Sequence, residues 1–265
     1  MRTHTHPYLL TALCAVAFLI FCPALHANAV LSTLTLSASG YSYTPSSPGS
    51  GSLGNVGPYT ATVKDATTNA VLFTGTVFCL DGNITGNIGN GLWVDLYDLV
   101  SPTGASGHVT ISGYDQSTLY NGFTLAQREE EAAFLAATAL SKGAHSSGDS
   151  ATQQANVDGP IQYAVWQEMG TNTKSGVTYT DSKAAPYMTQ AAAKVSPVAD
   201  PFWTSAAYLK SVYMWIPVTG AAGSYTFSAA AQRFVTATAA PEPGTLAFLG
   251  TGILLLALGK LRRRR

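Results

Sequence analysis

The order of strand-like and helix-like segments is the feature that most restricts the fold of this sequence. Segments with the alternation or short apolar runs of β-strands lie at both ends of the middle region, at residues 30–37, 59–63, 71–80, 92–99, 108–112, 206–218 and 223–237. The Pro/Gly/Ser-rich residues 44–58 are expected to form a loop. Strands followed by helices and then by strands predict an α+β domain, an antiparallel β-sandwich or barrel with an inserted helical subdomain.

Three helices are expected within that insertion. Residues 124–140 contain strong helix formers after a Thr cap, and Glu129 to Glu131 are expected to lie on the solvated face of this helix. A second helix is expected from an N-cap at Asp158 to Gly170, with Gln167 and Glu168 on its solvated side. The third is expected over residues 183–195.

The first 29 residues have the pattern of a secretory signal. An apolar run from Leu9 to Phe21 follows the basic Arg2, and Ala27-Asn28-Ala29 forms an A-x-A cleavage site. We therefore expect export and cleavage by signal peptidase, after Ala29 or alternatively after Ala27. Residues 30–240 would form the mature domain.

The last 25 residues combine three features. Pro241-Glu242-Pro243 is followed by an apolar stretch, residues 244–259, which contains Leu246, Phe248, Leu254 and Leu255 and is expected to form a transmembrane helix. A basic tail then keeps the end of the chain in the cytoplasm; it consists of Lys260, Arg262, Arg263, Arg264 and Arg265. By itself the segment would serve as an ordinary membrane anchor.

In combination, residues 241–265 resemble the PEP-CTERM sorting signal. The resemblance implies a Gram-negative bacterium in which an exosortase of the inner membrane recognises the Pro-Glu-Pro segment. The protein would be anchored in that membrane before processing, and would then reach the cell surface or the extracellular matrix. The resemblance also implies an organism that makes an extracellular polysaccharide.

Charge and motif content exclude several classes of function. Only 11% of the residues are charged, and without its basic ends the chain is mildly acidic, which argues against nucleic acid as a partner. His108 and His145 have no ligand-spaced partners, and Asp81, Asp95 and Asp98 do not have the spacing of a calcium loop. No hydrolase, phosphate-binding or dinucleotide motif is present. We therefore expect that the protein binds no cofactor and no metal and that it is not an enzyme.

Two polar groups stand out in apolar surroundings. Removal of the signal segment takes Cys14 and Cys22 with it, so Cys79 would be the lone cysteine of an exported protein. Gln162 lies on a helix face that is otherwise apolar. A thiol that attacks the glutamine amide and expels ammonia would form an internal thioester. The first-turn N–H groups and the helix dipole are expected to stabilise the oxyanion.

These residues resemble the bacterial surface thioester domains of the TQXA family. Phe78-Cys79-Leu80-Asp81 is similar to their aromatic-Cys-x-Asp motif, and residues 161–166 to their hydrophobic-Gln-hydrophobic-x-hydrophobic-Trp motif, with Ile161 in place of Thr. The resemblance implies that Cys79 is the thiol donor, that Gln162 is the acyl donor, and that Asp81 and Trp166 support them. It also implies covalent capture of an amine-bearing target during adhesion. The alternative is a non-covalent structural or exopolysaccharide-associated matrix protein with an inert buried Cys79.

Overall fold

The computed structural model describes residues 29–37, 40–45, 53–82, 88–102, 104–144, 148–171, 173–174, 177–178, 181–195, 201–220 and 224–236. The expected sorting signal and all but the last residue of the expected signal peptide lie outside these ranges. Within them, no helix is both long and apolar enough to cross a membrane.

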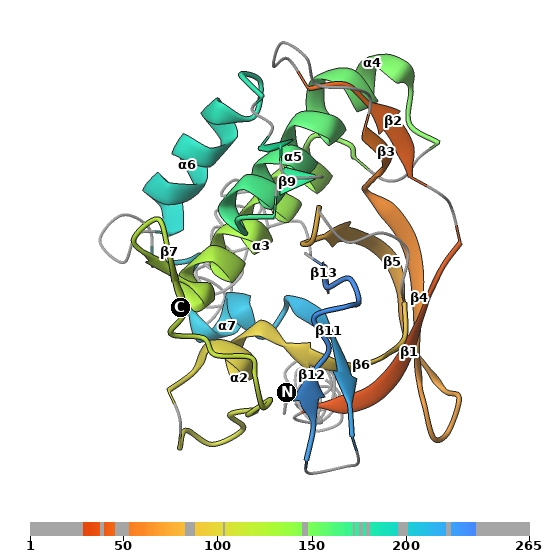
Figure 1. The fold of residues 1–265 in the computed structure, drawn as a ribbon, viewed down its shortest axis with the longest axis vertical. Helices are drawn as coiled ribbons and strands as arrows, with labels where there is room; N and C mark the ends of the chain where they lie inside the picture. Colours follow the sequence, from red (N-terminus) through yellow and green to blue (C-terminus); the bar gives the residue numbers. More distant parts are fainter. Residues whose placement is uncertain are drawn as a thin grey trace, which may run out of the picture.

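The long strands of the described part of the chain form a closed antiparallel β-barrel (Figure 1). Around it run β6 (Asn90–Asp95), β1 (Val30–Leu36), β4 (Tyr59–Asp65), β5 (Val71–Cys79), β13 (Phe234–Val235) and β11 (Tyr213–Thr219). β11 pairs back onto β6, with Trp215 opposite Trp93, and this pairing closes the ring. Of the two arrangements that the sequence predicted, the barrel is therefore the one that forms.

Alternation along the strands divides the apolar residues into two cores. One core is a compact cluster that draws side chains from all six barrel strands: Leu34, Tyr59, Ala61, Val63, Val77, Cys79, Trp93, Trp215 and Phe234. Their neighbours in sequence, such as Phe78, Leu92 and Met214, join the helices in the second core. Because Cys79 belongs to the first core and Phe78 to the second, the end of β5 contributes to both.

The helices gather on one side of the barrel (Figure 1). α3 (Leu125–Ser141) packs against α5 (Gly159–Glu168) and α6 (Ala185–Val195), as the predicted helical insertion requires. A capping box starts α3, because the Thr124 hydroxyl accepts from the Gln127 N–H while the Gln127 side chain accepts from the Thr124 N–H. α5 is preceded without a break by α4 (Ala151–Gln153) and by a π-helical turn, η1 (Gln154–Asp158).

Shorter elements complete the fold: β2 (Tyr41–Tyr43), β3 (Leu53–Val56), α2 (Leu96–Val100), β7 (Leu119–Tyr120), β8 (Phe123–Thr124), β9 (Thr173–Lys174), β10 (Val177–Thr178), α7 (Ala206–Leu209) and β12 (Thr226–Phe227). β12 pairs with β11 at the side of the barrel. β3 lies inside residues 44–58, so the prediction that this whole segment is a loop was wrong.

Several strand predictions were too long, because capping side chains end or replace the strand. The strand predicted over 92–99 stops at Asp95, whose carboxylate accepts from the Asp98 N–H and starts α2. Residues 206–209 form α7 rather than a strand, since the Ser205 hydroxyl caps them. Residues 108–112 contribute only a single bridge, at Ser112.

The acidic residues of α3 also differ from expectation. Glu129 and Glu131 are buried between packed elements, whereas the sequence predicted a solvated face. Glu168 of α5 is half-buried and its carboxyl group interacts with that of Glu131. The faces of α3 and α5 that bear these glutamates are polar in sequence, but neighbouring elements cover them. The periodicity of a single helix does not show such coverage.

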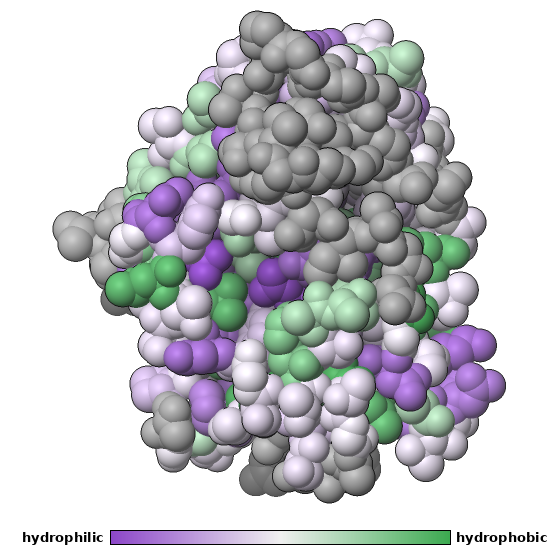
Figure 2. Space-filling model, in the orientation of Figure 1, coloured by the Kyte–Doolittle hydropathy of each residue, from purple (hydrophilic) through white to green (hydrophobic). Residues whose placement is uncertain are grey.

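Weakly polar residues dominate the visible face of the molecule. Figure 2 shows that most of its coloured atoms are pale, with small hydrophilic and hydrophobic patches between them. This agrees with the low charged fraction of the sequence, 11%. Residues of hydropathy near zero, such as Ser, Thr and Gly, therefore account for much of this face.

Candidate functional site

Cys79 is the last residue of β5 and is completely buried. Its thiol donates a weak hydrogen bond to the backbone carbonyl of Asp81, with 3.5 Å between Sγ and O. Burial, and next the negative charge of Asp81, raise the pKa of Cys79 to about 12. The side chain is therefore a neutral thiol near neutral pH.

The carboxamide of Gln162 is bound to the backbone of Cys79. The Cys79 N–H donates to Gln162 Oε1 over 3.2 Å, and Gln162 Nε2 donates to the Cys79 carbonyl over 2.6 Å. β4 begins at Tyr59, opposite Val77, so Cys79 lies two residues beyond the end of that ladder. The Gln162 amide thus takes the place that the next residue of β4 would have occupied. Cys79 and Gln162 meet here although 83 positions separate them in sequence.

Gly57 leaves the space that this arrangement needs. A Cβ atom at this position would lie 2.8 Å from Gln162 Oε1 and 2.7 Å from the ring of Tyr59. Contacts this short require one of the two neighbours to move. The missing side chain at Gly57 therefore lets the amide of Gln162 approach the end of β5.

The surroundings of the amide carbonyl differ from the sequence prediction. Asp158 is not an N-cap: its backbone is helical, and it makes no side-chain capping bond. Helical structure already begins at Ala151, so Gln162 does not lie in an open first turn. The donor to Oε1 is instead the N–H of Cys79 itself. This N–H polarises the carbonyl that the thiol of the same residue would attack.

Trp166 covers the pair from the following turn of α5. Its ring lies against Gly82, where a Cβ atom would be only 2.6 Å from Trp166 Cδ2. Thr171 holds the backbone of residues 80–82 in position. Its hydroxyl donates to the Leu80 carbonyl over 2.7 Å and accepts from the Gly82 N–H over 3.1 Å. Trp166 is itself 5% exposed, so the pair has little access to solvent.

Asp81 holds the chain beyond β5 through a buried ion pair. Its carboxylate lies 2.5 Å from Arg233 Nη2 and also accepts from the Arg233 backbone N–H over 2.7 Å. Arg233 Nη1 donates to the Tyr114 hydroxyl over 3.2 Å, and that hydroxyl bonds to Glu129. Burial nevertheless raises the pKa of Glu129 to about 6. Through its bonds to Arg233, which directly precedes β13, Asp81 anchors the end of β5 to β13.

Four residues of this site were not found from the sequence: Gly57, Gly82, Thr171 and Arg233. The glycines and Thr171 act through contacts between distant segments, which no local pattern reveals. Arg233 offered a signal, since it is a lone cation in the apolar segment "AAAQRFV". A buried arginine requires an anionic partner, and Asp81 is one of the acidic residues in the sequence that could supply it.

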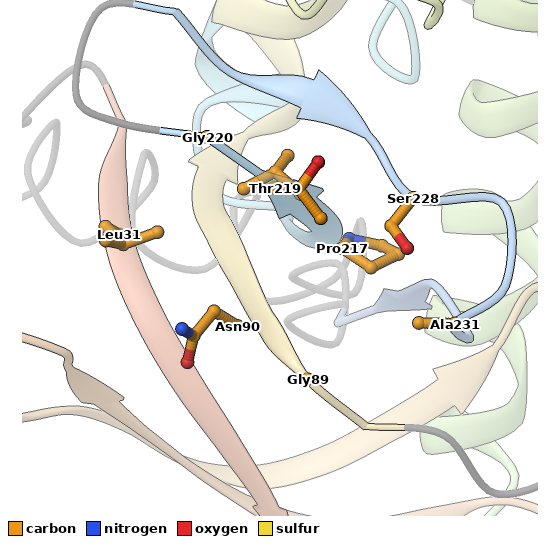
Figure 3. Close-up of a pocket in the computed structure, with 9 residues that line it drawn as sticks. Leu31, Gly89, Asn90, Pro217, Thr219, Gly220, Ser228 and Ala231 are labelled. Atoms are coloured by element: carbon orange, nitrogen blue, oxygen red, sulfur yellow. The ribbon is translucent and has the colours of Figure 1, made fainter.

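Other parts of the described structure offer less chemistry. A cavity of about 290 Å³ lies between β1, β6 and β11, where Asn90, Thr219 and Ser228 supply polar side chains (Figure 3). Its lining includes neither Cys79 nor Gln162. Among the described residues, no cluster of His, Cys, Asp or Glu side chains could hold a metal ion. His108 is half-buried, and His145 lies outside the described residues.

Comparisons with known proteins assign no family to the chain. No family model, no curated protein and no solved structure matches it.

Proposed function

We propose that the protein is an exported surface or matrix protein that attaches covalently to an amine-bearing target through a thioester between Cys79 and Gln162. One observation carries the proposal: both polar atoms of the Gln162 amide are bonded to the backbone of Cys79, at 3.2 and 2.6 Å. This places the carboxamide carbon beside the residue that bears the thiol, in a site with little access to solvent.

The bond would form with loss of ammonia. The Cys79 sulphur attacks Cδ of Gln162, the Cδ–Nε2 bond breaks, and the thiol proton leaves with the nitrogen as NH₃. The Cys79 N–H, which donates to Oε1, would stabilise the negative charge that develops on that oxygen. Because the thiol is neutral near neutral pH, it supplies the proton that the leaving nitrogen needs.

Capture of a target would reverse the chemistry with a different amine. A primary amine attacks Cδ, an amide forms, and the Cys79 thiol is released. The protein is consumed in this step, so we do not class it as an enzyme. A lysine side chain on a partner, or an amine-bearing component of the matrix, would be the target, and adhesion the outcome.

Export and sorting belong to the same proposal. Signal peptidase would remove residues 1–29, and an exosortase would act at Pro241, Glu242 and Pro243 while the following apolar segment spans the inner membrane. The support is the resemblance of residues 241–265 to the PEP-CTERM signal. The final location would be the surface or matrix of a Gram-negative bacterium.

Intact mass of the purified residues 30–240 tests the thioester. Wild-type protein is expected to be lighter than its sequence by one molecule of ammonia, and methylamine should add at Gln162 and free the Cys79 thiol. Cys79→Ala and Gln162→Ala variants serve as controls and should have their full sequence masses. A full wild-type mass with a free thiol would refute the thioester, provided peptide mapping finds Gln rather than the hydrolysis product Glu at position 162.

A second candidate is a non-covalent matrix protein with an inert Cys79. The same pair of hydrogen bonds favours it, because an amide whose nitrogen and oxygen are both hydrogen-bonded is stable in a core without further chemistry. In this alternative Gln162 serves only to complete the backbone ladder at the end of β5. The mass measurement separates the two candidates.

A further inference from the structure

The indole N–H of Trp166 is a buried donor without an acceptor. Within the described part of the structure, Trp166 Nε1 makes no hydrogen bond of ordinary geometry. Indole nitrogen can only donate, and a buried donor left unpaired carries a free-energy cost. Most buried polar groups of proteins are paired, so an exception in a candidate reaction site calls for a functional explanation.

The position of this donor follows from its place on α5 and from two contacts. Trp166 follows Gln162 by one turn of α5, so both lie on the same helix face. The ring packs against Gly82, three residues after Cys79. The Trp166 side chain also interacts with the Cys79 side chain, and this interaction lowers the thiol pKa, in partial opposition to the large rise caused by burial.

Other N–H groups around Cys79 have acceptors already. The Cys79 N–H donates to Gln162 Oε1, the Leu80 N–H to the Arg233 carbonyl, and the Gly82 N–H to the Thr171 hydroxyl. The Asp81 carbonyl accepts from the thiol and would repel a thiolate. Of these neighbours, only Trp166 combines a free donor with proximity to the sulphur.

Amine capture creates the need for such a donor. When the amine attacks, the new Cδ–N bond forms and the electron pair of the Cδ–Sγ bond passes to sulphur. Burial makes a bare thiolate at this position unfavourable, as the raised pKa of about 12 indicates. The leaving sulphur therefore needs a hydrogen bond until the proton released by the amine reaches it.

We propose that Trp166 Nε1–H stabilises the departing Cys79 sulphur when the thioester is opened. The inference rests on the proposed thioester and deepens it. It gives Trp166 a chemical role in addition to its cover over the pair. The same hydrogen bond would also assist hydrolysis of the thioester, because attack by water and attack by an amine both release the Cys79 sulphur.

Trp166→Phe and Trp166→Ala variants test the role. The Phe variant retains an aromatic cover without the N–H, so capture of methylamine and spontaneous hydrolysis should both slow by at least about tenfold, the lower end of the loss expected for one hydrogen bond to a charged group. The Ala variant removes the cover, and its hydrolysis should be faster than that of the Phe variant. Mass spectrometry over time measures both rates. Wild-type rates in the Phe variant would overturn the inference.

Two controls keep this result separate from that for the thioester itself. A wild-type protein with its full sequence mass refutes the thioester and removes the basis of the inference. If the Phe variant forms no thioester, alkylation of the free Cys79 thiol by iodoacetamide is compared in Gln162→Ala and in the Gln162→Ala, Trp166→Phe double variant. Slower alkylation of the folded double variant supports the donor role, and equal rates across the pH range contradict it.

Discussion

At the scale of single residues, the site depends on groups whose partners are all buried. Gln162 completes the ladder beyond β4, and Asp81 is neutralised by Arg233. Neither contact is held by solvent-exposed charges, so neither is strongly screened by salt. Substitutions here should therefore act through packing and uncompensated charge.

Gly57→Ala should disturb the amide. The added Cβ would come within 2.8 Å of Gln162 Oε1 and 2.7 Å of the Tyr59 ring, which forces one of them to shift. We expect a loss of about 1–3 kcal/mol in the free energy of unfolding, and a smaller fraction of chains that lack ammonia. Denaturant unfolding and intact mass measure the two effects. Gly89→Ala is the control, because a Cβ there meets nothing within 4 Å; equal effects of both variants would contradict the packing argument.

Arg233→Ala should leave the Asp81 carboxylate buried and unpaired. Removal of one partner of a buried ion pair typically costs about 3–5 kcal/mol. Thermal or denaturant unfolding should show a large loss of stability in this variant. Lys64→Ala, a half-buried cation of β4, should change stability far less. A small effect at Arg233 would mean that water reaches Asp81.

At the scale of elements, the contact between α3 and α5 carries paired carboxyl groups. Burial, and next repulsion from Glu168, raise the pKa of Glu131 from its ordinary 4.5 to about 8. Burial also raises the pKa of Glu168. The two helices therefore pack best when the pair keeps a proton, which links the position of α5 to pH.

Stability should fall as the pH rises from 4.5 to 8. The folded protein keeps the Glu131 proton in this window while the unfolded chain has released it, so the contribution of this group is full below pH 4.5 and is lost as the pH passes 8. Glu131→Gln should flatten this decline and raise stability at pH 8, as measured by denaturant unfolding at several pH values. Asp115→Asn is the control, because the pKa of exposed Asp115 is lowered. An unchanged pH profile in Glu131→Gln would contradict the assignment.

At the scale of the whole molecule, the barrel brings distant segments to one point. β5 and β13 pair across the site, and α5 covers the end of β5 from the helical side (Figure 1). The proposed reaction therefore requires the folded domain, whereas the proposed export depends on short segments at the two ends. The two parts of the proposal can be tested independently.

Deletion of residues 241–265 should misplace the protein without changing its core chemistry. Fractionation of cells should find the truncated protein released or in the periplasm, while full-length protein reaches the surface or matrix. The truncated protein should still lose ammonia. Surface retention equal to that of the full chain would refute the sorting role. N-terminal sequencing of the exported protein should begin at residue 30, or at residue 28 if cleavage follows Ala27.

The sequence by itself determined the class of the fold and the helical insertion, and it indicated Cys79 and Gln162 as candidates, because these follow from periodicity, composition and local motifs. It did not determine the barrel closure, since pairing of β11 with β6 depends on long-range register. It also placed Glu129 and Glu131 in solvent and an N-cap at Asp158, because burial and helix continuation depend on neighbours far along the chain. Only the tertiary structure showed that the Gln162 amide meets the Cys79 backbone. That contact depends on where β4 begins and on the absence of a side chain at Gly57, which no local pattern encodes.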